Sequence, residues 1–521
     1  MASITRRAPW ALLAILLLGL AVRVYNVSGN PPELIVDELD LYNSAQSFAL
    51  TGHDVDGSRL PFLWCSFTRN PPMYAVAEYI SSLIFGNGPF GLRFPAVIFG
   101  LVAIALVYFI TLELTRRREI ALVAALLTAT QPIFILFSRV GWEPASELPF
   151  LLGGLYFWLR AFRRLDPPED AAAPLRWSEL LAGGVLFGLS AYTYMAAWFY
   201  AVMLGGAILV VNARRLRSRV QIVRIGAAVL AGCAIASPAL WMWFGDPYTF
   251  SRTGHISTFH DGLNLASLAT FVANYFAQFG WSYLVTTGDP SGGATWKYMA
   301  GFGAFYWWLV PLAALGIACT FRYIPARWAA VWTLLWLLFY PLGGALTNEA
   351  VPNAPRTLAG APAFCVLAAI GLLALFDFAR SRIAPRFRNQ VQIGLGVVCA
   401  ANLVVSLVLF SIFYDTRYPR LYPVAWDSGT RSTFAVLRDQ VPSYRRLCFS
   451  VRPAWYTAET FFRYYLADRP IKTFQNVALA ECFLPGTLLV TDTPLDRPGF
   501  TTIATVREIG GGSFATIAGR R

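Results

Sequence analysis

Charged residues are scarce in this chain. Only 14% of its 521 residues are Asp, Glu, Lys or Arg, whereas 56% are hydrophobic and the mean hydropathy is +0.52. A soluble globular protein carries about 25% charged residues and needs polar side chains over most of its surface. The composition therefore excludes a soluble globular protein of this length and indicates a membrane protein.

Lysine is nearly absent, because Lys297 and Lys472 are the only two in the sequence. The net charge of +13 therefore comes from arginine, and about half of the arginines fall in six short breaks between apolar runs. Along the chain, every second break between apolar runs is rich in arginine, which is the positive-inside pattern of a membrane protein. The distribution argues against nucleic-acid binding. The six groups are Arg6 and Arg7; Arg116, Arg117 and Arg118; Arg160, Arg163, Arg164 and Arg176; Arg214, Arg215, Arg217, Arg219 and Arg224; Arg322 and Arg327; and Arg380, Arg382, Arg386 and Arg388.

Apolar runs approaching 20 residues predict membrane-spanning helices. With the six arginine groups in the cytoplasm, the pattern predicts an all-α polytopic protein of the cell (inner or plasma) membrane with a cytoplasmic amino terminus. Its first span has an alternative interpretation as a cleaved signal peptide, although no clear small-x-small site follows. The predicted spans are 8–25, 92–114, 119–137, 145–162, 178–194, 197–212, 223–243, 303–320, 328–346, 357–378 and 391–413.

The remaining residues are expected outside the cell. A membrane domain at 1–413 would carry two long extracytoplasmic loops, 26–91 and 244–302. The tail, 414–521, alternates apolar and polar residues in pieces such as Arg446–Val451 and Thr487–Thr491, and such alternation indicates strands. We therefore expect a small extracytoplasmic α/β domain at the carboxyl end.

The seven cysteines indicate no metal site, because Cys-x-x-Cys and His-Glu-x-x-His patterns are absent. No cofactor is predicted, and the sequence leaves a role for a divalent ion open. Cys448 and Cys482 lie in the predicted outer tail, where a disulfide is one option. Their spacing alone does not decide it.

The first outer loop opens with an acidic pair, Asp37-Glu38, inside the stretch Pro31–Ala45. The residues after the pair are helix-like and lie near the predicted bilayer surface. A carboxylate there can accept a proton from a hydroxyl nucleophile while it faces a lipid-borne substrate. The pair also fits acids that simply begin a helix and interact with its dipole, and from the residues alone this plainer interpretation is favoured.

Several further stretches follow in a fixed order, and together they resemble one family over about residues 20–375. The stretches, besides the acidic pair, are Thr51-Gly52-His53-Asp54, Arg69-Asn70-Pro71-Pro72-Met73-Tyr74, Phe85-Gly86, Leu92-Arg93-Phe94-Pro95, Phe137-Ser138-Arg139 and Pro352-Asn353-Ala354-Pro355-Arg356-Thr357. The resemblance is to GT-C membrane glycosyltransferases of the protein O-mannosyltransferase and aminoarabinose transferase type, glycosyltransferase families 39 and 83.

The resemblance implies a sugar donor carried on polyprenyl phosphate, an inverting transfer and no nucleotide-sugar site. The acceptor would be a glycolipid, a polysaccharide or a protein on the outer side. Asp37 would then be the base that takes the acceptor's proton, or the group that orients it, and Glu38 would be its partner. Asn353 stands in a stretch where many relatives place a histidine, which leaves the sugar preference open.

An anionic donor needs fixed cations at the outer membrane boundary. Arginine suits this task because its planar fork binds phosphate oxygens in pairs. The candidates are Arg139, Arg356, Arg252 and Lys297, all on the predicted outer face, where the positive-inside rule gives no reason for positive charge. Contact with lipid headgroups is an equally good explanation for Lys297.

Two weaker candidates stand near these cations in the sequence. Glu143 is either a second acid of the site or a salt-bridge partner of Arg139. His255 follows Arg252 in the second long loop, although a loop histidine is more often an ordinary surface residue. Aromatic residues make up 15% of the chain, and interfacial belts explain most of them.

Two other functions remain to be distinguished. A transporter or lipid flippase is the main alternative, but transporters tend to show paired halves, broken helices and ionisable residues within spans. Here the ionisable groups concentrate in the outer loops. A non-catalytic envelope protein that retains an enzyme fold is the third option, and the presence of Asp37, Arg139 and Arg356 argues against it only weakly.

Overall fold

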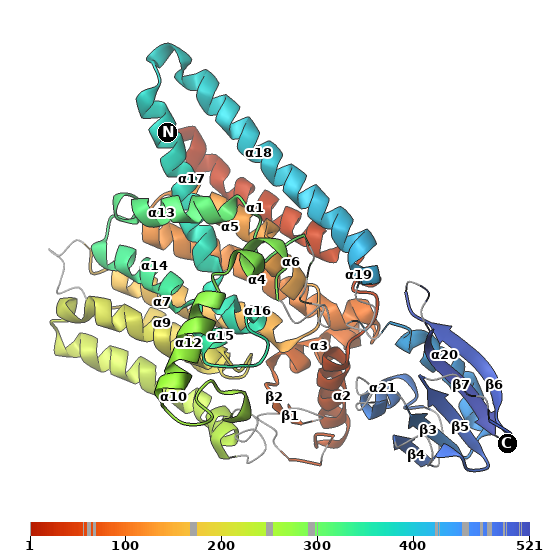
Figure 1. The fold of residues 1–521 in the computed structure, drawn as a ribbon. Helices are drawn as coiled ribbons and strands as arrows, with labels where there is room; N and C mark the ends of the chain where they lie inside the picture. The colour runs from red at the N-terminus through yellow and green to blue at the C-terminus, as the bar shows by residue number, and fades with distance from the viewer. Residues whose placement is uncertain are drawn as a thin grey trace.

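A computed structural model describes most of the chain as a helical bundle with a small sheet domain at one end (Figure 1). The described residues are 2–55, 57–59, 64–65, 69–166, 175–245, 254–289, 297, 299, 301–421, 426, 428–450, 458–468, 473–476, 482–492, 495, 497–509, 511 and 513–520.

Each of the eleven predicted spans coincides with a helix or a pair of helices. Among the described residues, six helical segments are long and apolar enough to cross a bilayer, and four shorter helices are also apolar. The all-α membrane architecture is thereby confirmed. The helices at the predicted spans are α1 (Ala2–Val24), α4 (Pro89–Thr115), α5 (Arg118–Thr130) with α6 (Pro132–Phe137), α7 (Glu147–Arg163), α8 (Trp177–Ser190), α9 (Ala197–Asn212), α10 (Arg219–Gly245), α13 (Leu309–Tyr323), α14 (Arg327–Phe339), α17 (Pro362–Arg382) and α18 (Arg388–Ile412).

The segment 119–137, predicted as one span, is divided into two helices, α5 and α6. The chain leaves the helical conformation at Gln131, with ψ at 143°, and Pro132 begins the second helix. A proline disfavours the helical conformation of the residue before it and is well accommodated at the first position of a new helix. The side-chain oxygen of Gln131 accepts a hydrogen bond from the Tyr306 N–H at 2.9 Å, which stabilises the break.

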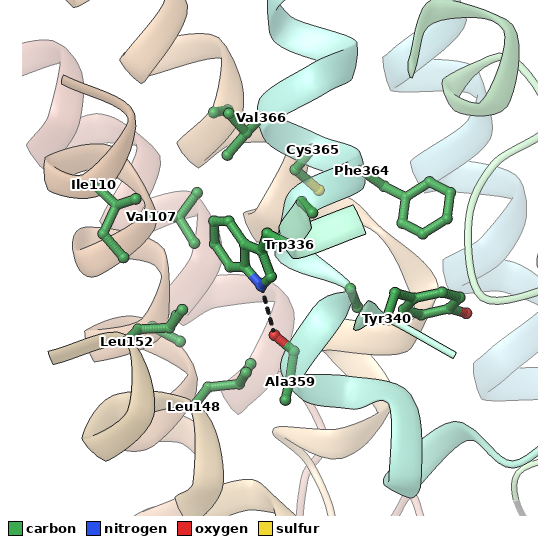
Figure 2. Close-up of a cluster of buried hydrophobic side chains, with 14 of the residues drawn as sticks. Val107, Ile110, Leu148, Leu152, Trp336, Tyr340, Ala359, Phe364, Cys365 and Val366 are labelled. Carbon is green, nitrogen blue, oxygen red and sulfur yellow. Dashed lines mark hydrogen bonds between the residues drawn. The ribbon is translucent and has the colours of Figure 1, made fainter. Parts of the chain in front are cut away.

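Small residues allow the closest contacts in the bundle. A Cβ atom on Gly316 of α13 would lie 1.8 Å from the Leu367 carbonyl oxygen of α17, and one on Gly371 would lie 1.9 Å from the Leu312 oxygen. Such close backbone approach is typical of helix pairs in membranes. Nearby, the Trp336 indole donates to the Ala359 carbonyl at 3.1 Å among buried side chains of α4, α7 and α17 (Figure 2).

The predicted outer loops contain structure of their own. The first loop holds the expected helix after the acidic pair, and it also holds a second helix that the sequence did not predict. The second loop holds one longer helix and a π-helical turn. Their bounds are α2 (Val36–Thr51), β1 (Trp64–Cys65), β2 (Arg69–Asn70), α3 (Met73–Phe85), α12 (Leu265–Ala277) and the turn Ser282–Thr286; the short helices α15 (Leu342–Ala345) and α16 (Ala354–Thr357) follow α14.

The tail forms the small α/β domain expected from the sequence. Its sheet has the strand order β4-β3-β5-β7-β6, in which β3 runs parallel to β4 and β5, and β7 runs antiparallel to β5 and β6. A disulfide joins Cys448 and Cys482 with their Cα atoms 5.8 Å apart. The elements are α19 (Tyr418–Leu421), α20 (Thr430–Gln440), β3 (Arg446–Ser450), α21 (Ala458–Tyr465), β4 (Thr473–Asn476), β5 (Thr487–Thr491), β6 (Thr501–Arg507) and β7 (Ser513–Arg520).

The tail domain packs directly on α2. Leu34 and Leu39 share one buried apolar cluster with Phe434 and other residues of the tail. The Asn43 amide also donates to the Thr460 carbonyl at 2.9 Å. Helix α2 is therefore held between the bundle and the tail (Figure 1).

Candidate functional site

Glu38 anchors the first turn of α2. Its side chain has no exposed surface, and it forms a two-pronged ion pair with Arg93 of α4, with N–O distances of 2.7 and 2.9 Å. Its carboxylate also accepts hydrogen bonds from the main-chain N–H groups of Gly141 at 2.8 Å and Ile35 at 3.0 Å. A buried carboxylate is stable only when its oxygens are paired in this way. Glu38 therefore has the contacts of a residue that fixes its neighbour's position.

Two buried arginines hold the segment that leads from α1 to the acidic pair. Arg93 donates to the carbonyl oxygens of Val27, Pro31 and Glu33, and Arg139 donates to those of Val22, Arg23 and Asn30. Main-chain carbonyls at a helix end need partners, and the guanidinium groups provide several at once. The segment 22–33 is thereby tied to α4 and to the loop after α6.

Asp37 lies in the first turn of α2, where it is half-buried. Its position follows from its neighbour, because the Glu38 carboxylate is bonded to both Arg93 and Gly141. A Cβ atom on Gly141 would lie 3.2 Å from that carboxylate, so a side chain at residue 141 would crowd the contact between this loop and α2. This approach brings the start of α2 next to Trp142.

Trp142 connects three parts of the chain. Its ring stacks on Phe137 with centroids 6.2 Å apart and meets the edge of Tyr194 at 6.3 Å. The Lys297 ammonium lies 5.7 Å from the centroid of the same ring. A cation at that distance is attracted by the electron-rich face of an indole. Lys297, from the second predicted outer loop, is therefore held close to the loop that contacts α2.

Lys297 and Arg356 are both shielded cations, since each side chain is only 12% exposed. Lys297 pairs with the buried Asp289 at 3.4 Å. Arg356 bonds to the side chain of Thr347 at 2.6 Å and to the Glu349 carboxylate at 2.8 Å. The same guanidinium interacts with the Tyr194 hydroxyl. Tyr194 thus lies between Arg356 and the ring of Trp142.

Several buried acids adjoin this arrangement. Glu143 interacts electrostatically with Tyr194 and with Glu78 of α3. Glu78 is fully buried, and neither of its oxygens has a hydrogen-bond partner. Burial, together with the nearby Glu38 charge, raises the pKa of Glu78 well above its usual range. Burial therefore favours the protonated form of Glu78.

This burial predicts a pH dependence of stability. A carboxyl group whose pKa is higher in the folded state stabilises the fold at low pH, and the contribution is lost as pH rises from the ordinary carboxyl pKa of about 4.3 through the raised value. The variant Glu78→Gln cannot ionise. Its unfolding temperature should fall less on the alkaline side than that of the parent protein, measured from pH 5 to 9 in detergent. Parallel curves for the two proteins would contradict the assignment.

The structure brings some predicted site residues together and not others. Four of the predicted residues share one area, the segment 141–143 and Tyr194. Glu38, the neighbour of Asp37, bonds to Gly141, and Lys297 lies near the ring of Trp142. Glu143 belongs to the segment itself, and Arg356 interacts with Tyr194. The guanidinium of Arg139 instead faces α1 and lies 5.1 Å from the ring centroid of Tyr414. His255 is exposed in the second loop, and Arg252 lies outside the described residues.

Sequence reasoning gave no role to Arg93, which it named only within the stretch Leu92-Arg93-Phe94-Pro95, and none to Trp142 or Tyr194. Arg93 carried a further signal, because it stands at the predicted outer end of a span, where the positive-inside rule gives no reason for it. Trp142 and Tyr194 carried none, since aromatic residues are frequent at every outer span end. Among the described residues, no group of three or more His, Cys, Asp or Glu side chains could hold a metal ion.

Residues 69–243 match the sequence model of a family described as dolichyl-phosphate-mannose-protein mannosyltransferase. The match covers about a third of the chain. No curated protein matches the sequence.

The fold is similar to that of several solved membrane enzymes. The Archaeoglobus fulgidus oligosaccharyltransferase, tethered to an acceptor peptide, has a TM-score of 0.55 at 16% identity; the match covers 90% of this chain but only 64% of that enzyme. ArnT from Cupriavidus metallidurans in the apo state has a TM-score of 0.55 at 13% identity, and the match covers 97% of both chains. The same ArnT bound to undecaprenyl phosphate has a TM-score of 0.53 at 12% identity, with 99% of this chain and 98% of that chain covered. The TM-scores show that the chain shares its fold with these enzymes, although few of the aligned residues are identical.

Proposed function

We propose that this chain is a membrane glycosyltransferase of the GT-C type, which transfers a sugar from a polyprenyl-phosphate donor to an extracytoplasmic acceptor. The fold that it shares with ArnT and the archaeal oligosaccharyltransferase supports this proposal. ArnT is solved with undecaprenyl phosphate and a related archaeal oligosaccharyltransferase with dolichol phosphate, so a lipid-phosphate donor suits this fold. The acceptor would be a glycolipid, a polysaccharide or a protein bearing a hydroxyl group.

One observation supports this proposal most strongly. Two shielded cations, Lys297 and Arg356, come from distant parts of the sequence, and their contacts meet around Trp142 and Tyr194. The residue before Trp142, Gly141, donates to the carboxylate of Glu38, which directly follows the half-buried Asp37 at the start of α2. Transfer from an anionic donor needs this combination, namely a base for the acceptor and positive charge for the leaving phosphate.

In the proposed reaction, the acceptor hydroxyl attacks the anomeric carbon from the face opposite the phosphate, and the configuration inverts. Asp37 takes the hydroxyl proton as the new glycosidic bond forms. The bond between the sugar and the phosphate oxygen breaks, and the polyprenyl phosphate departs with the electron pair. Lys297 and Arg356 stabilise the charge that develops on that phosphate. Glu38 keeps Asp37 in place through Arg93 and Gly141.

We assign the donor phosphate to Lys297 and Arg356 and give Arg139 a positioning role. Arg139 already donates to three main-chain carbonyls, and its contacts share no residue with those of the other two cations. The site proposed here requires no resident metal or cofactor. It also requires the topology deduced from the arginine pattern, with the first and second loops and the tail domain outside the cell membrane.

Arg356→Gln should raise the KM for the lipid donor by about 10- to 100-fold, because a hydrogen bond to a charged group contributes about 1.5–3 kcal/mol and each 1.4 kcal/mol is tenfold. Initial rates at varied donor concentration measure the effect. Arg386→Gln, which changes an exposed arginine in a predicted cytoplasmic break, is the matched control and should leave KM unchanged. An unchanged KM in Arg356→Gln would remove that residue from the donor site.

The proposed function can be tested with the purified full-length protein. Membranes from a strain that lacks the gene supply the acceptor, and synthetic polyprenyl phosphates carrying different sugars supply the donor. We expect one donor to be consumed, with free polyprenyl phosphate and glycosylated acceptor formed in equal amounts. Failure to consume any donor, when the fold is intact by thermal unfolding, would argue for a transporter or a non-catalytic protein.

A further inference from the structure

A pocket of about 290 Å³ lies where the carboxyl ends of α1 and α18 meet. Its walls come from the last turn of α1, from α6, and from the π-helical turn Phe413–Arg417 that follows α18. Most of the lining is apolar, and Arg139 and Asp415 supply its charged groups. The lining residues are Ala21, Val22, Tyr25, Ile135, Arg139, Phe410, Ser411, Tyr414 and Asp415.

The pocket opens beside α18, a helix whose side chains are mostly exposed. Of the residues in α18, only Phe410 is buried, and Figure 1 shows this helix along the edge of the bundle. Exposed apolar side chains continue along both helices, for example Leu17 on α1 and Val408 on α18. In a membrane protein such faces contact lipid chains. With α1 and α18 placed in the bilayer as the predicted spans 8–25 and 391–413, the pocket at their ends lies near the boundary between lipid chains and headgroups.

Arg139 is a buried cation with an unfilled bonding site. The residue is 2% exposed, and its side chain has no carboxylate partner among the described residues. Its Nε–H group has no acceptor. An unpaired buried charge is costly unless a counterion is present. An anionic oxygen in the pocket would supply both the counter-charge and the missing hydrogen bond.

Asp415 sets a second condition on the ligand. It lines the same pocket and accepts a hydrogen bond from the Asn30 amide at 3.0 Å, while the Asn30 carbonyl accepts from Arg139. No cationic side chain of the described chain forms an ion pair with Asp415. A ligand with phosphate alone would meet this carboxylate as a like charge. A ligand that carries phosphate and ammonium together would satisfy both groups.

We propose that this pocket binds the headgroup of a zwitterionic phospholipid of the phosphatidylethanolamine type. The phosphate pairs with Arg139, the ammonium pairs with Asp415, and the acyl chains lie between α1 and α18. The bound lipid fills the space beside α18 and ties the helix that leads into the tail domain to α1. The proposal uses none of the residues assigned to the donor phosphate and does not depend on the proposed transfer reaction.

Native mass spectrometry of the detergent-solubilised full-length protein tests the proposal. The probes are phosphatidylethanolamine, phosphatidylglycerol with the same acyl chains, and undecaprenyl phosphate. We expect the parent protein to retain phosphatidylethanolamine at least ten times better than phosphatidylglycerol. Asp415→Asn should bring the two phospholipids to about equal retention, whereas Asp261→Asn, a change at an exposed loop acid, should leave the preference intact.

A second variant guards against an indirect effect of the first. Ser411→Trp fills the pocket without changing its charges and should abolish retention of both phospholipids, with the unfolding temperature showing that the protein remains folded. Equal retention of the two phospholipids by the parent protein would overturn the proposal. Preferential retention of undecaprenyl phosphate, or a lipid-free dimer that covers α18, would overturn it as well.

Discussion

Asp37→Asn is expected to lower the rate of sugar transfer by about 10²–10⁴-fold, because general-base catalysis contributes a factor of that size. An asparagine keeps nearly the same shape but cannot take the acceptor's proton. The residue is half-buried in the first turn of α2, so the change should leave membrane insertion and the unfolding temperature unaltered. The measurement is turnover at saturating donor and acceptor.

Asp439→Asn provides the matched control for this prediction. It makes the same chemical change at an exposed acid on α20, far from the start of α2 in the sequence, and turnover should stay at the parent level. If Asp37→Asn retains nearly full turnover, Asp37 is not the base. An acceptor that is already an anion, such as a phosphate, would then be the first alternative to test.

Arg93→Met is expected to destabilise the protein by about 3–5 kcal/mol, the range for removing one partner of a buried ion pair. The substitution leaves the buried Glu38 carboxylate without its counter-charge. It also removes the donors to Val27, Pro31 and Glu33. We expect a large loss of folded protein in detergent and a lower unfolding temperature, both measured against the parent chain.

The double variant Arg93→Met, Glu38→Met separates the effect of the unpaired Glu38 charge from the effect of the lost hydrogen bonds to main-chain carbonyls. It removes both charges, so it should recover part of the lost stability but not the part due to the three carbonyl groups. Arg382→Met, at an exposed arginine of α17, should have little effect. A single Arg93→Met variant as stable as the parent would mean that the pair does not hold α2 in place.

Much of the fold follows from local sequence. An apolar run of span length has few alternatives in a membrane, and the eleven predicted spans accordingly coincide with helices. The strand Thr487–Thr491 also has the predicted bounds. Helix α3 was missed, because Met73–Phe85 is apolar but too short for a span and stands in a long loop. The break at Gln131 could have been predicted from Pro132, but the apolar run alone gives no sign of it.

The site was predictable only in part, because its contacts join distant segments. The acidic pair at the start of a helix could be recognised in one stretch of sequence. The pairing of Glu38 with Arg93 could not, since 55 residues separate them. Arg139 shows a second limit. Its place outside the positive-inside pattern marks it as special, but a guanidinium can donate to main-chain carbonyl oxygens as well as to phosphate oxygens, and only the fold shows the carbonyls.

The central claim is that Asp37 and the cations Lys297 and Arg356 together transfer a lipid-linked sugar. Mass spectrometry of envelope glycolipids and glycans tests it most directly, in a deletion strain carrying either the parent gene or the Asp37→Asn variant. We predict that one sugar residue of defined mass is missing in the deletion strain, returns with the parent gene and does not return with the variant. Identical envelope glycans in all strains would contradict the account.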